Sequence, residues 1–296
     1  MKLIPLTQKF DKEFNIQNIP PDMPFSKLIP KIYEEWDIDF RKYIEKNFVN
    51  TFHGLMIKNC EEVLKVYLTV FLSEEILDKI FNRGERNILI FSHHPMDMET
   101  NNRGFLPLSE KYFKDMREKM VSVYSLHTPL DIHEKISTSI SIANTLALKN
   151  LMKYHKNSIG FSGVTGELEK EVTFDEFIHT VQKVFNVEEI HFIKNKPTVS
   201  KIGIIAGGGS NPKYIEETKS LGCDTYLTGE YVNRINNEYG MQQKKEFEEL
   251  KPSIDINLIE CSHYATEKVV LQKEIMQMFN LEGVDCEFME QNNPWK

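Results

Sequence analysis

The stretch Ile88-Leu89-Ile90-Phe91-Ser92-His93-His94-Pro95 decides the fold that we expect for this chain. Its apolar residues follow one another without alternation, which is typical of a strand that is buried on both faces of a sheet. The strand stops at Pro95, because proline has no backbone N–H to donate to a neighbouring strand. His93 and His94 therefore lie where a buried strand emerges, and open α/β sheets bind ligands at that edge.

The histidine pair alone leaves two interpretations open. Side chains of consecutive strand residues point to opposite faces. His93 and His94 can therefore share one metal only if the backbone turns, or bind two metals if each ring reaches its own ion. The simpler interpretation is that two polar side chains close a strand.

Two further strand ends favour a metal site. One short apolar run leads into His127 and Asp131, and another leads into His263 and Glu267. The last two are four positions apart, so a helix after that strand would place them on one face. Imidazole and carboxylate together suit zinc, iron, manganese or nickel. A carboxylate such as Glu267 can bridge two ions, as a hydrolytic two-metal site requires.

Composition narrows the class of protein. The chain has 296 residues, 41% hydrophobic and 27% charged, with a formal net charge of −8. The negative charge argues against nucleic acid as the main partner. No apolar run is long enough for a transmembrane helix, and residues 1–9 lack the apolar core of a secretory signal. We therefore expect a cytoplasmic protein that acts on a small-molecule substrate, with no membrane or nucleic-acid partner.

The cysteines agree with that compartment. Cys60, Cys223, Cys261 and Cys286 are scattered and show no CxxC spacing. Such cysteines are typical of reduced, mostly buried thiols in a cytosolic protein. We expect Cys261 to be buried rather than to bind metal.

Alternating strands and helices predict an α/β architecture. We expect an N-terminal extension over residues 1–45, a first α/β half over 46–150, a connecting segment over 151–200, and a second half over 201–296 that completes the metal site. Within the extension, residues 1–24 are expected to be irregular and 25–42 helical. Strands over 51–57 and 62–68 are predicted to pair with each other.

Helix signals place the remaining elements. A helix capped by Ser73 should join the strand of residues 62–68 to the His93-His94 strand, which implies that these two strands are parallel. Thr173 and Glu176 form a capping box that opens a helix to about Phe185. Further helices are expected over 108–120, 134–148, 215–221, 233–251 and 268–278, and a hairpin over 160–167.

Gly207-Gly208-Gly209-Ser210 follows a buried strand and precedes a helix. This order resembles a phosphate-binding turn, in which backbone N–H groups face an anion. The dinucleotide and P-loop fingerprints are both absent. The alternative is a loop in which glycine permits a positive φ and a close backbone approach at the edge of the metal pocket.

The remaining polar residues are weaker candidates. His133 is two residues from Asp131 and is a candidate for contact with a metal ligand. Asp97 and Glu99 follow the histidine pair and could approach the site. The other histidines are expected to be surface or packed residues without carboxylate partners; they are His53, His155, His179 and His191.

Taken together, the motifs resemble those of the NIF-three-like family, whose members are often named as homologues of GTP cyclohydrolase type 2. The markers are His93-His94-Pro95, His127 to Asp131, Gly160 to Glu167, Gly207 to Ser210, Asp224 to Glu230, and His263 to Glu267. The sequence departs from the family pattern where residues 50–55 lack its tryptophan-aspartate-asparagine motif. It also has Ser262 where glycine is usual, and its first 45 residues have no family counterpart.

The resemblance implies a three-layer α/β/α fold of two similar, intertwined halves, a dinuclear metal site, and ring-shaped hexamers. By motif position, the metal ligands would be His93, His94, Asp131, His263 and Glu267. His127 would line the site as a catalytic residue. Residues 228–230 resemble the family's threonine-glycine-acid turn, with a structural role near the pocket.

Two functions follow as hypotheses. The first is a hydrolase with two divalent metal ions, such as zinc, iron or manganese, that acts on a nucleotide or a related phosphorylated compound. His127 would carry a proton to the leaving group, since histidine titrates near neutral pH. The second is a non-catalytic protein that stores metal or forms a ring as a scaffold. An open coordination position distinguishes a catalytic metal site from a closed one.

Overall fold

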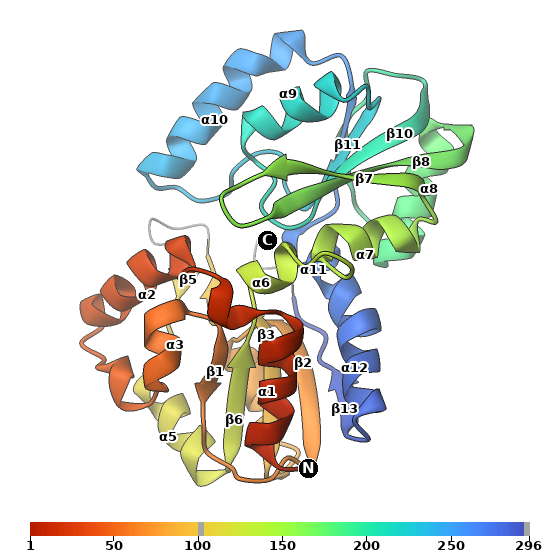
Figure 1. Cartoon of the computed structure of the whole chain (residues 1–296). Helices are drawn as coiled ribbons and strands as arrows, with labels where there is room; N and C mark the ends of the chain where they lie inside the picture. The colour runs from red at the N-terminus through yellow and green to blue at the C-terminus, as the bar shows by residue number, and fades with distance from the viewer. Residues whose placement is uncertain (100–103, 293–296) are drawn as a thin grey trace. The chain divides into compact units, whose positions relative to one another are not determined.

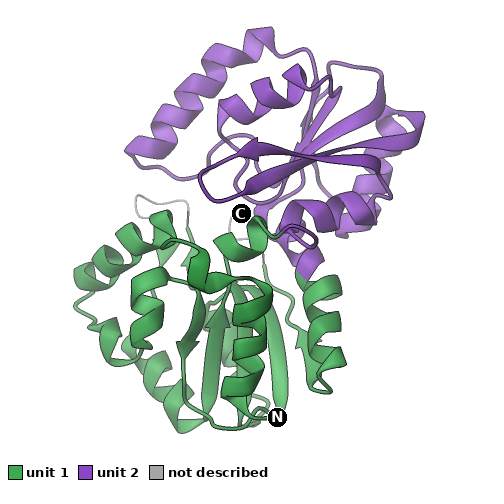
Figure 2. Ribbon diagram, in the orientation of Figure 1, with its two compact units in different colours: residues 1–99, 105–133, 271–292 green, residues 100–104, 134–270, 293–296 purple. Residues whose placement is uncertain are grey.

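The structure is a computed structural model that describes residues 1–99 and 104–292 (Figure 1). The chain forms two compact units, which Figure 2 shows in different colours. Unit 1 contains residues 1–99, 105–133 and 271–292, and unit 2 contains Gly104 and residues 134–270. The chain thus enters unit 1 three times, and the predicted α/β architecture of intertwined halves is confirmed. The last part of the predicted second half, residues 293–296, lies outside the described residues.

Unit 1 is built on a five-stranded sheet. Its strand order is β1 (Gly54–Ile57), β6 (Val121–Ser125), β3 (Ile88–His94), β2 (Lys65–Phe71) and β13 (Asp285–Phe288). All neighbours are parallel except β1, which is antiparallel to β6. Helices α4 (Glu74–Phe81) and α5 (Glu110–Glu118) form the two crossovers. The predicted parallel pair of β2 and β3 is confirmed, and every residue of β3 is buried.

The predicted pairing of β1 with β2 is wrong. The strand β2 lies between β3 and β13, whereas β1 borders β6. Six of the seven residues of β2 are buried, and an apolar run of that kind belongs inside a parallel sheet rather than in a hairpin. The segment between β1 and β2 contacts β6 instead. The backbone N–H groups of Asn59 and Cys60 donate to the hydroxyl of Ser122, a residue of β6.

The expectation of an irregular segment over residues 1–24 is also wrong. Helix α1 spans Leu3–Glu13, and Pro5 lies in its first turn. Backbone N–H groups of the first turn have no acceptor within the helix, so a proline there removes no helical hydrogen bond. Phe10 packs its ring against three aromatic rings of unit 1, namely Phe91 of β3, Tyr124 of β6 and Phe279 of α12. Residues 1–13 are therefore part of the core of unit 1. Helix α2 (Met23–Glu35) follows and is capped by Asp22.

Three consecutive helical segments precede the last strand, β13. Helix α11 (His263–Val270) belongs to unit 2, and a π-helical turn (Leu271–Ile275) and α12 (Met276–Leu281) belong to unit 1. The predicted helix over 268–278 is confirmed in position. The π turn interrupts the α-helical hydrogen-bond pattern where the chain passes from unit 2 to unit 1.

Unit 2 contains a six-stranded sheet. Its strand order is β7 (Lys149–Lys156), β8 (Phe161–Thr173), β10 (Thr198–Ile205), β11 (Thr225–Thr228), β12 (Asn257–Glu260) and β9 (His191–Ile193). The central pairs β10–β11 and β11–β12 are parallel. The predicted hairpin around residues 160–167 is confirmed as the β7–β8 pair.

Helices cover both faces of this sheet. Leu227 and Ile259 point into a core shared with α7 (Thr138–Thr145), α8 (Phe174–Phe185) and α11. Their neighbours Tyr226 and Leu258 point into a second core, shared with α9 (Pro212–Ser220) and α10 (Glu238–Leu250). Adjacent strand residues thus serve opposite faces, which gives unit 2 its three α/β/α layers.

Local signals explain several element ends. The capping box is confirmed, since Thr173 Oγ1 accepts the N–H of Glu176 and the Glu176 carboxylate accepts the N–H of Thr173. The helix predicted from residue 134 begins only at Thr138, because the hydroxyl of Ser137 caps it. The shorter elements are the helices η1 (Ile16–Asn18), η2 (Phe40–Lys42), α3 (Lys46–Thr51), α6 (Thr128–Asp131) and η3 (Lys251–Ser253), and the strands β4 (Asp97–Met98) and β5 (Phe105–Leu106).

Two expectations from composition can be checked. All four cysteines are free thiols, and Cys60, Cys223 and Cys261 are buried as predicted. Within residues 1–99 and 104–292, no helix combines the length and apolar character that crossing a bilayer requires.

Candidate metal centre

Three strand ends carry the predicted site residues. His93 and His94 are the last residues of β3, and both are buried. His127 lies just beyond β6 and precedes α6, which ends with Asp131. In unit 2, β12 leads into α11, whose first residue is His263. The strand ends predicted from the sequence are thus all present, two in unit 1 and one in unit 2.

Unit 1 brings together His93, His94, His127 and Asp131, which we call the unit 1 cluster. One ligand atom from each of the three histidines lies within 4.8 Å of the others. The rings of His93 and His94 are nearly perpendicular, at 88°, with their centroids 4.7 Å apart. The His127 ring lies 5.0 Å from the first and 4.7 Å from the second. The two neighbouring histidines therefore converge on one place although both lie in β3.

Hydrogen bonds orient two of these rings. His93 Nδ1 donates to the backbone oxygen of Leu126 at 2.9 Å, and its Nε2 lies 3.4 Å from Asp131 Oδ1. His127 Nδ1 donates to Asp22 Oδ2 at 2.7 Å, and its Nε2 lies 3.7 Å from Asp131 Oδ2. Carbonyl and carboxylate oxygens can only accept, so Nδ1 carries the proton in both rings. Both histidines thus turn Nε2 toward the same carboxylate.

Asp22 is a residue that the sequence analysis missed. It lies 105 positions before His127, in a stretch where only its place before Met23-Pro24 marks it as a helix cap. Its side chain is fully buried. No local pattern connects a helix cap to a distant histidine, so the contact emerges only from the folded chain.

Unit 2 brings together His263, Glu267 and Glu230, which we call the unit 2 cluster. His263 Nδ1 lies 3.1 Å from Glu230 Oε1, and its Nε2 lies 3.1 Å from Glu267 Oε1. All three residues are buried. The motif resemblance predicts only a structural role for Glu230 in a turn, whereas the Glu230 carboxylate contacts the His263 imidazole.

The two carboxylates favour positive charge at His263. Burial lowers the pKa of this imidazole, but the charges and hydrogen bonds of Glu267 and Glu230 outweigh it and raise the pKa well above its usual value. Burial raises the pKa of Glu230. An environment that stabilises a proton on a buried ring also favours a metal cation next to that ring.

Gly207 packs against this cluster with no room for a side chain. A Cβ built there would lie 2.1 Å from Glu267 Oε1 and 3.1 Å from His263 Nε2, and the φ angle is +64°. A Cβ on Gly229 would lie 2.8 Å from the Cα of His263. Close backbone approach therefore explains glycine at both positions, as one of the two interpretations of the glycine loop predicted.

The weaker candidates lie elsewhere. His133 Nε2 is 3.8 Å from Glu13 Oε1, and its ring packs on Phe14. Asp97 is half-buried in β4, and burial raises its pKa to about 6. The expectation that His155 has no carboxylate partner is wrong, because its Nδ1 lies 2.8 Å from Glu217 Oε2. That pair joins β7 to α9, a pairing between distant residues that local sequence does not reveal.

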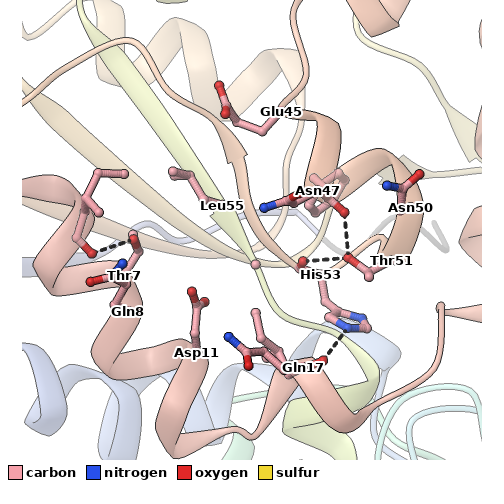
Figure 3. A pocket seen from close by; sticks show the side chains of 14 residues that line it. Thr7, Gln8, Asp11, Gln17, Glu45, Asn47, Asn50, Thr51, His53 and Leu55 are labelled. Carbon is pink, nitrogen blue, oxygen red and sulfur yellow. Dashed lines mark hydrogen bonds between the residues drawn. The ribbon is translucent and has the colours of Figure 1, made fainter.

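A separate pocket of about 480 Å³ lies in unit 1 (Figure 3). Polar side chains of α1, of α3 and of the loop before β1 line it, among them Asp11, Asn47 and His53. No member of the unit 1 cluster is among its described lining residues. We therefore keep this pocket distinct from the candidate metal centre.

The residues present suit a divalent transition metal. Imidazole nitrogens and carboxylate oxygens are the donors that zinc, iron and manganese accept in proteins. A metal-binding histidine commonly donates its second ring N–H to a carbonyl or carboxylate, as His93, His127 and His263 do here. The lack of a side chain at Gly207 lets the backbone lie close to His263 and Glu267. The donor set and its hydrogen bonds therefore fit a bound divalent metal.

Comparison with known sequences finds several bacterial relatives of similar length. A Haemophilus influenzae protein named as a homologue of GTP cyclohydrolase 1 type 2 is 26% identical over 243 residues, which are 82% of this chain and 90% of the relative. A Borreliella burgdorferi protein with the same name is 26% identical over 269 residues, covering 88% of this chain and 96% of its own.

Solved structures show the same fold. The protein ybgI, described as of unknown function, superposes with a TM-score of 0.69 at 18% identity, over 99% of this chain and 100% of that one. TTHA1606 from Thermus thermophilus superposes with a TM-score of 0.63 at 16% identity, over 99% of each chain. HcgD from Methanocaldococcus jannaschii, in its reduced form, superposes with a TM-score of 0.59 at 19% identity, over 88% of this chain and 98% of its own.

The family comparison accounts for most of the chain. The sequence model of Duf34/NIF3 (NGG1p interacting factor 3) matches residues 45–294, which include every member of the two clusters but not Asp22. The resemblance inferred from the motifs is thereby confirmed: this chain belongs to the DUF34/NIF3 family.

Proposed function

We propose that this protein binds two divalent metal ions through the unit 1 and unit 2 clusters and hydrolyses a nucleotide or a related phosphorylated compound. The proposed metal ligands are His93, His94, Asp131, His263 and Glu267. Bound divalent ions of this kind supply Lewis-acid activation of water and of a phosphoryl or carbonyl oxygen.

One observation carries the metal-binding part of the proposal. In each cluster, one histidine directs Nδ1 to an oxygen that accepts its hydrogen bond and directs Nε2 to a carboxylate oxygen. The distance from Nε2 to that carboxylate oxygen is 3.4 Å for His93 and 3.1 Å for His263. Anchoring the outer nitrogen fixes both the ring orientation and the tautomer that offers Nε2 as a ligand. A histidine that merely closes a strand has no need of two such partners.

His127 is the proposed proton carrier. Its Nδ1 is hydrogen-bonded to a buried carboxylate, and its Nε2 lies close to Asp131. A carboxylate that accepts from Nδ1 favours proton uptake at Nε2. One-fifth of the His127 side chain is exposed, so the ring can exchange a proton with a bound compound or with solvent.

The substrate class rests on the relatives. Those from Haemophilus influenzae and Borreliella burgdorferi carry the name of a GTP cyclohydrolase homologue. Ring opening of a purine nucleotide is a hydrolysis, as is cleavage of a phosphoester or a cyclic amide, and the proposed ligands suit each of these reactions. A small phosphorylated substrate also agrees with the acidic net charge, which disfavours a long nucleic acid.

The test is a substrate panel. Nucleoside triphosphates, phosphodiesters and cyclic amides are assayed with protein reconstituted with zinc, iron or manganese, alongside the His263→Ala variant and a chelated sample. We expect slow turnover of a nucleotide that chelation abolishes and metal restores, and that His263→Ala lacks. Metal that stays bound while no compound turns over above the chelated control would contradict the hydrolase proposal and leave a protein that only binds metal.

A further inference from the structure

We propose that Asp22 is a positioning residue for the unit 1 cluster: it holds His127 in the tautomer with the proton on Nδ1, so that Nε2, the nitrogen near Asp131, is the one that takes up and gives up the proton. This inference deepens the proposed function and rests on it. Asp22 lies outside residues 45–294, the part of the chain that the family model matches. The N-terminal segment would thus supply a functional contact that the matched residues lack.

Both oxygens of the Asp22 carboxylate accept hydrogen bonds. Oδ2 accepts from His127 Nδ1 at 2.7 Å and from the Thr128 hydroxyl at 2.6 Å. Oδ1 accepts the backbone N–H of Phe25 at 3.1 Å, which caps α2. One buried side chain therefore fixes the start of a helix and the ring of a histidine at the same time.

The position of Asp22 is itself held from several sides. Its backbone N–H donates to the carbonyl of Thr51, which ends α3. The ring of Phe25 packs on His127 and His94, with centroids 4.6 and 5.8 Å away. The first turn of α2 thus packs directly against the unit 1 cluster.

The carboxylate is ionised in this setting. Burial raises the pKa of Asp22, but His127, the Thr128 hydroxyl and the Phe25 N–H together outweigh it and hold the pKa well below its usual value. An ionised carboxylate accepts and cannot donate, so the proton between Asp22 and His127 stays on the imidazole. Nε2 is then the nitrogen of the neutral ring that carries the lone pair.

Asp22→Asn is the most direct variant. Asparagine keeps an oxygen for the Phe25 N–H, so α2 remains capped. Its amide N–H then faces His127, which must accept on Nδ1 and carry its proton on Nε2 instead. Asp22→Ser is the second variant, because serine also caps a helix but is too short to reach the ring.

Asp11→Asn is the matched control. Asp11 is also a partly buried carboxylate of the N-terminal segment, and its Oδ1 accepts from the hydroxyl of Tyr124 at 2.9 Å. It therefore tests the loss of a buried N-terminal charge without touching a histidine of the cluster.

The first readout is the tautomer of His127 in metal-free protein. Nitrogen-15 solid-state NMR of histidine-labelled samples distinguishes protonated Nδ1 from protonated Nε2, and a His127→Gln sample identifies the signal. We expect the Nδ1–H form in the unchanged protein and in Asp11→Asn, the Nε2–H form in Asp22→Asn, and a mixture in Asp22→Ser. An Nδ1–H signal that persists in Asp22→Asn and Asp22→Ser would overturn the proposal.

The second readout is turnover, measured with zinc-reconstituted protein and a nucleotide that the substrate panel identifies. Loss of such an oriented contact lowers activity by about 10–100-fold, and we expect a loss of this size in both Asp22 variants and none in Asp11→Asn. Equal turnover in all samples would also overturn the positioning role. If the unchanged protein turns over no compound of the panel, the proposed function fails, whereas the tautomer measurement still decides the role of Asp22.

Discussion

At the scale of single residues, the sequence predicted the candidate site residues but not the carboxylates that orient two of their histidines. His93, His94, His127, Asp131, His263 and Glu267 were found because each follows an apolar strand, a pattern that is visible locally. Asp22 and Glu230 hold two of the histidines from 105 and 33 positions away. A hydrogen bond across such a separation has no local sequence signal, because it exists only once the strands have paired.

A pair of substitutions tests the residue assignments. A carboxylate that bridges two ions supports both, so Glu267→Ala is expected to reduce the zinc content to below about one ion per chain. His133→Ala should leave the content unchanged, because His133 lies next to Glu13 and Phe14 rather than in the unit 1 cluster. Zinc is measured by elemental analysis after reconstitution, with circular dichroism to match folding. Equal zinc loss in both variants would show that the assignment is wrong.

At the scale of secondary-structure elements, prediction succeeded where a signal was local. The capping box of Thr173 and Glu176 and the buried strand ending at His94 are examples. It failed for α1, because the prolines at 20, 21 and 24, which break a helix, all lie beyond the end of α1 at Glu13. It also failed for the partner of β1, because the order of strands depends on contacts between distant segments.

Helix α1 is expected to stabilise unit 1 as part of its core. Phe10 is almost fully buried among the rings of Phe91, Tyr124 and Phe279. Phe10→Ala removes these contacts and should lower the free energy of unfolding by about 3–5 kcal/mol. Urea unfolding followed by fluorescence measures the loss.

Leu28→Ala is the control for that experiment. Leu28 lies in α2 of the same N-terminal segment but is 37% exposed, so its truncation should change stability by less than about 1 kcal/mol. If Phe10→Ala were as stable as Leu28→Ala, α1 would be an attachment to the unit rather than a part of its core.

At the scale of the whole molecule, the family determines the fold more firmly than the activity. Relatives at 26% identity and structures at 16–19% identity share the architecture. Function depends on the site rather than on the fold. The first 44 residues, which precede the family match, contribute α1, α2 and Asp22 to unit 1. The helical pattern of residues 25–42 predicted most of α2, whereas nothing in the sequence predicted α1 or the contact of Asp22.

The assembly predicted from the resemblance is a homo-oligomer, specifically a hexameric ring. Closed symmetry is the usual form of soluble homo-oligomers. Light scattering coupled to size-exclusion chromatography at micromolar concentration should report about six times the chain mass of 34.7 kDa. A species with the mass of a single chain would contradict the prediction.

The central claim is that the two clusters are metal sites, and metal stoichiometry tests it most directly. Protein stripped by a chelator is reconstituted with zinc, manganese or iron, freed of excess metal by gel filtration, and analysed by elemental mass spectrometry. The account predicts about two ions per chain for at least one metal. A content below about half an ion per chain with every metal, in protein that remains folded, would contradict it.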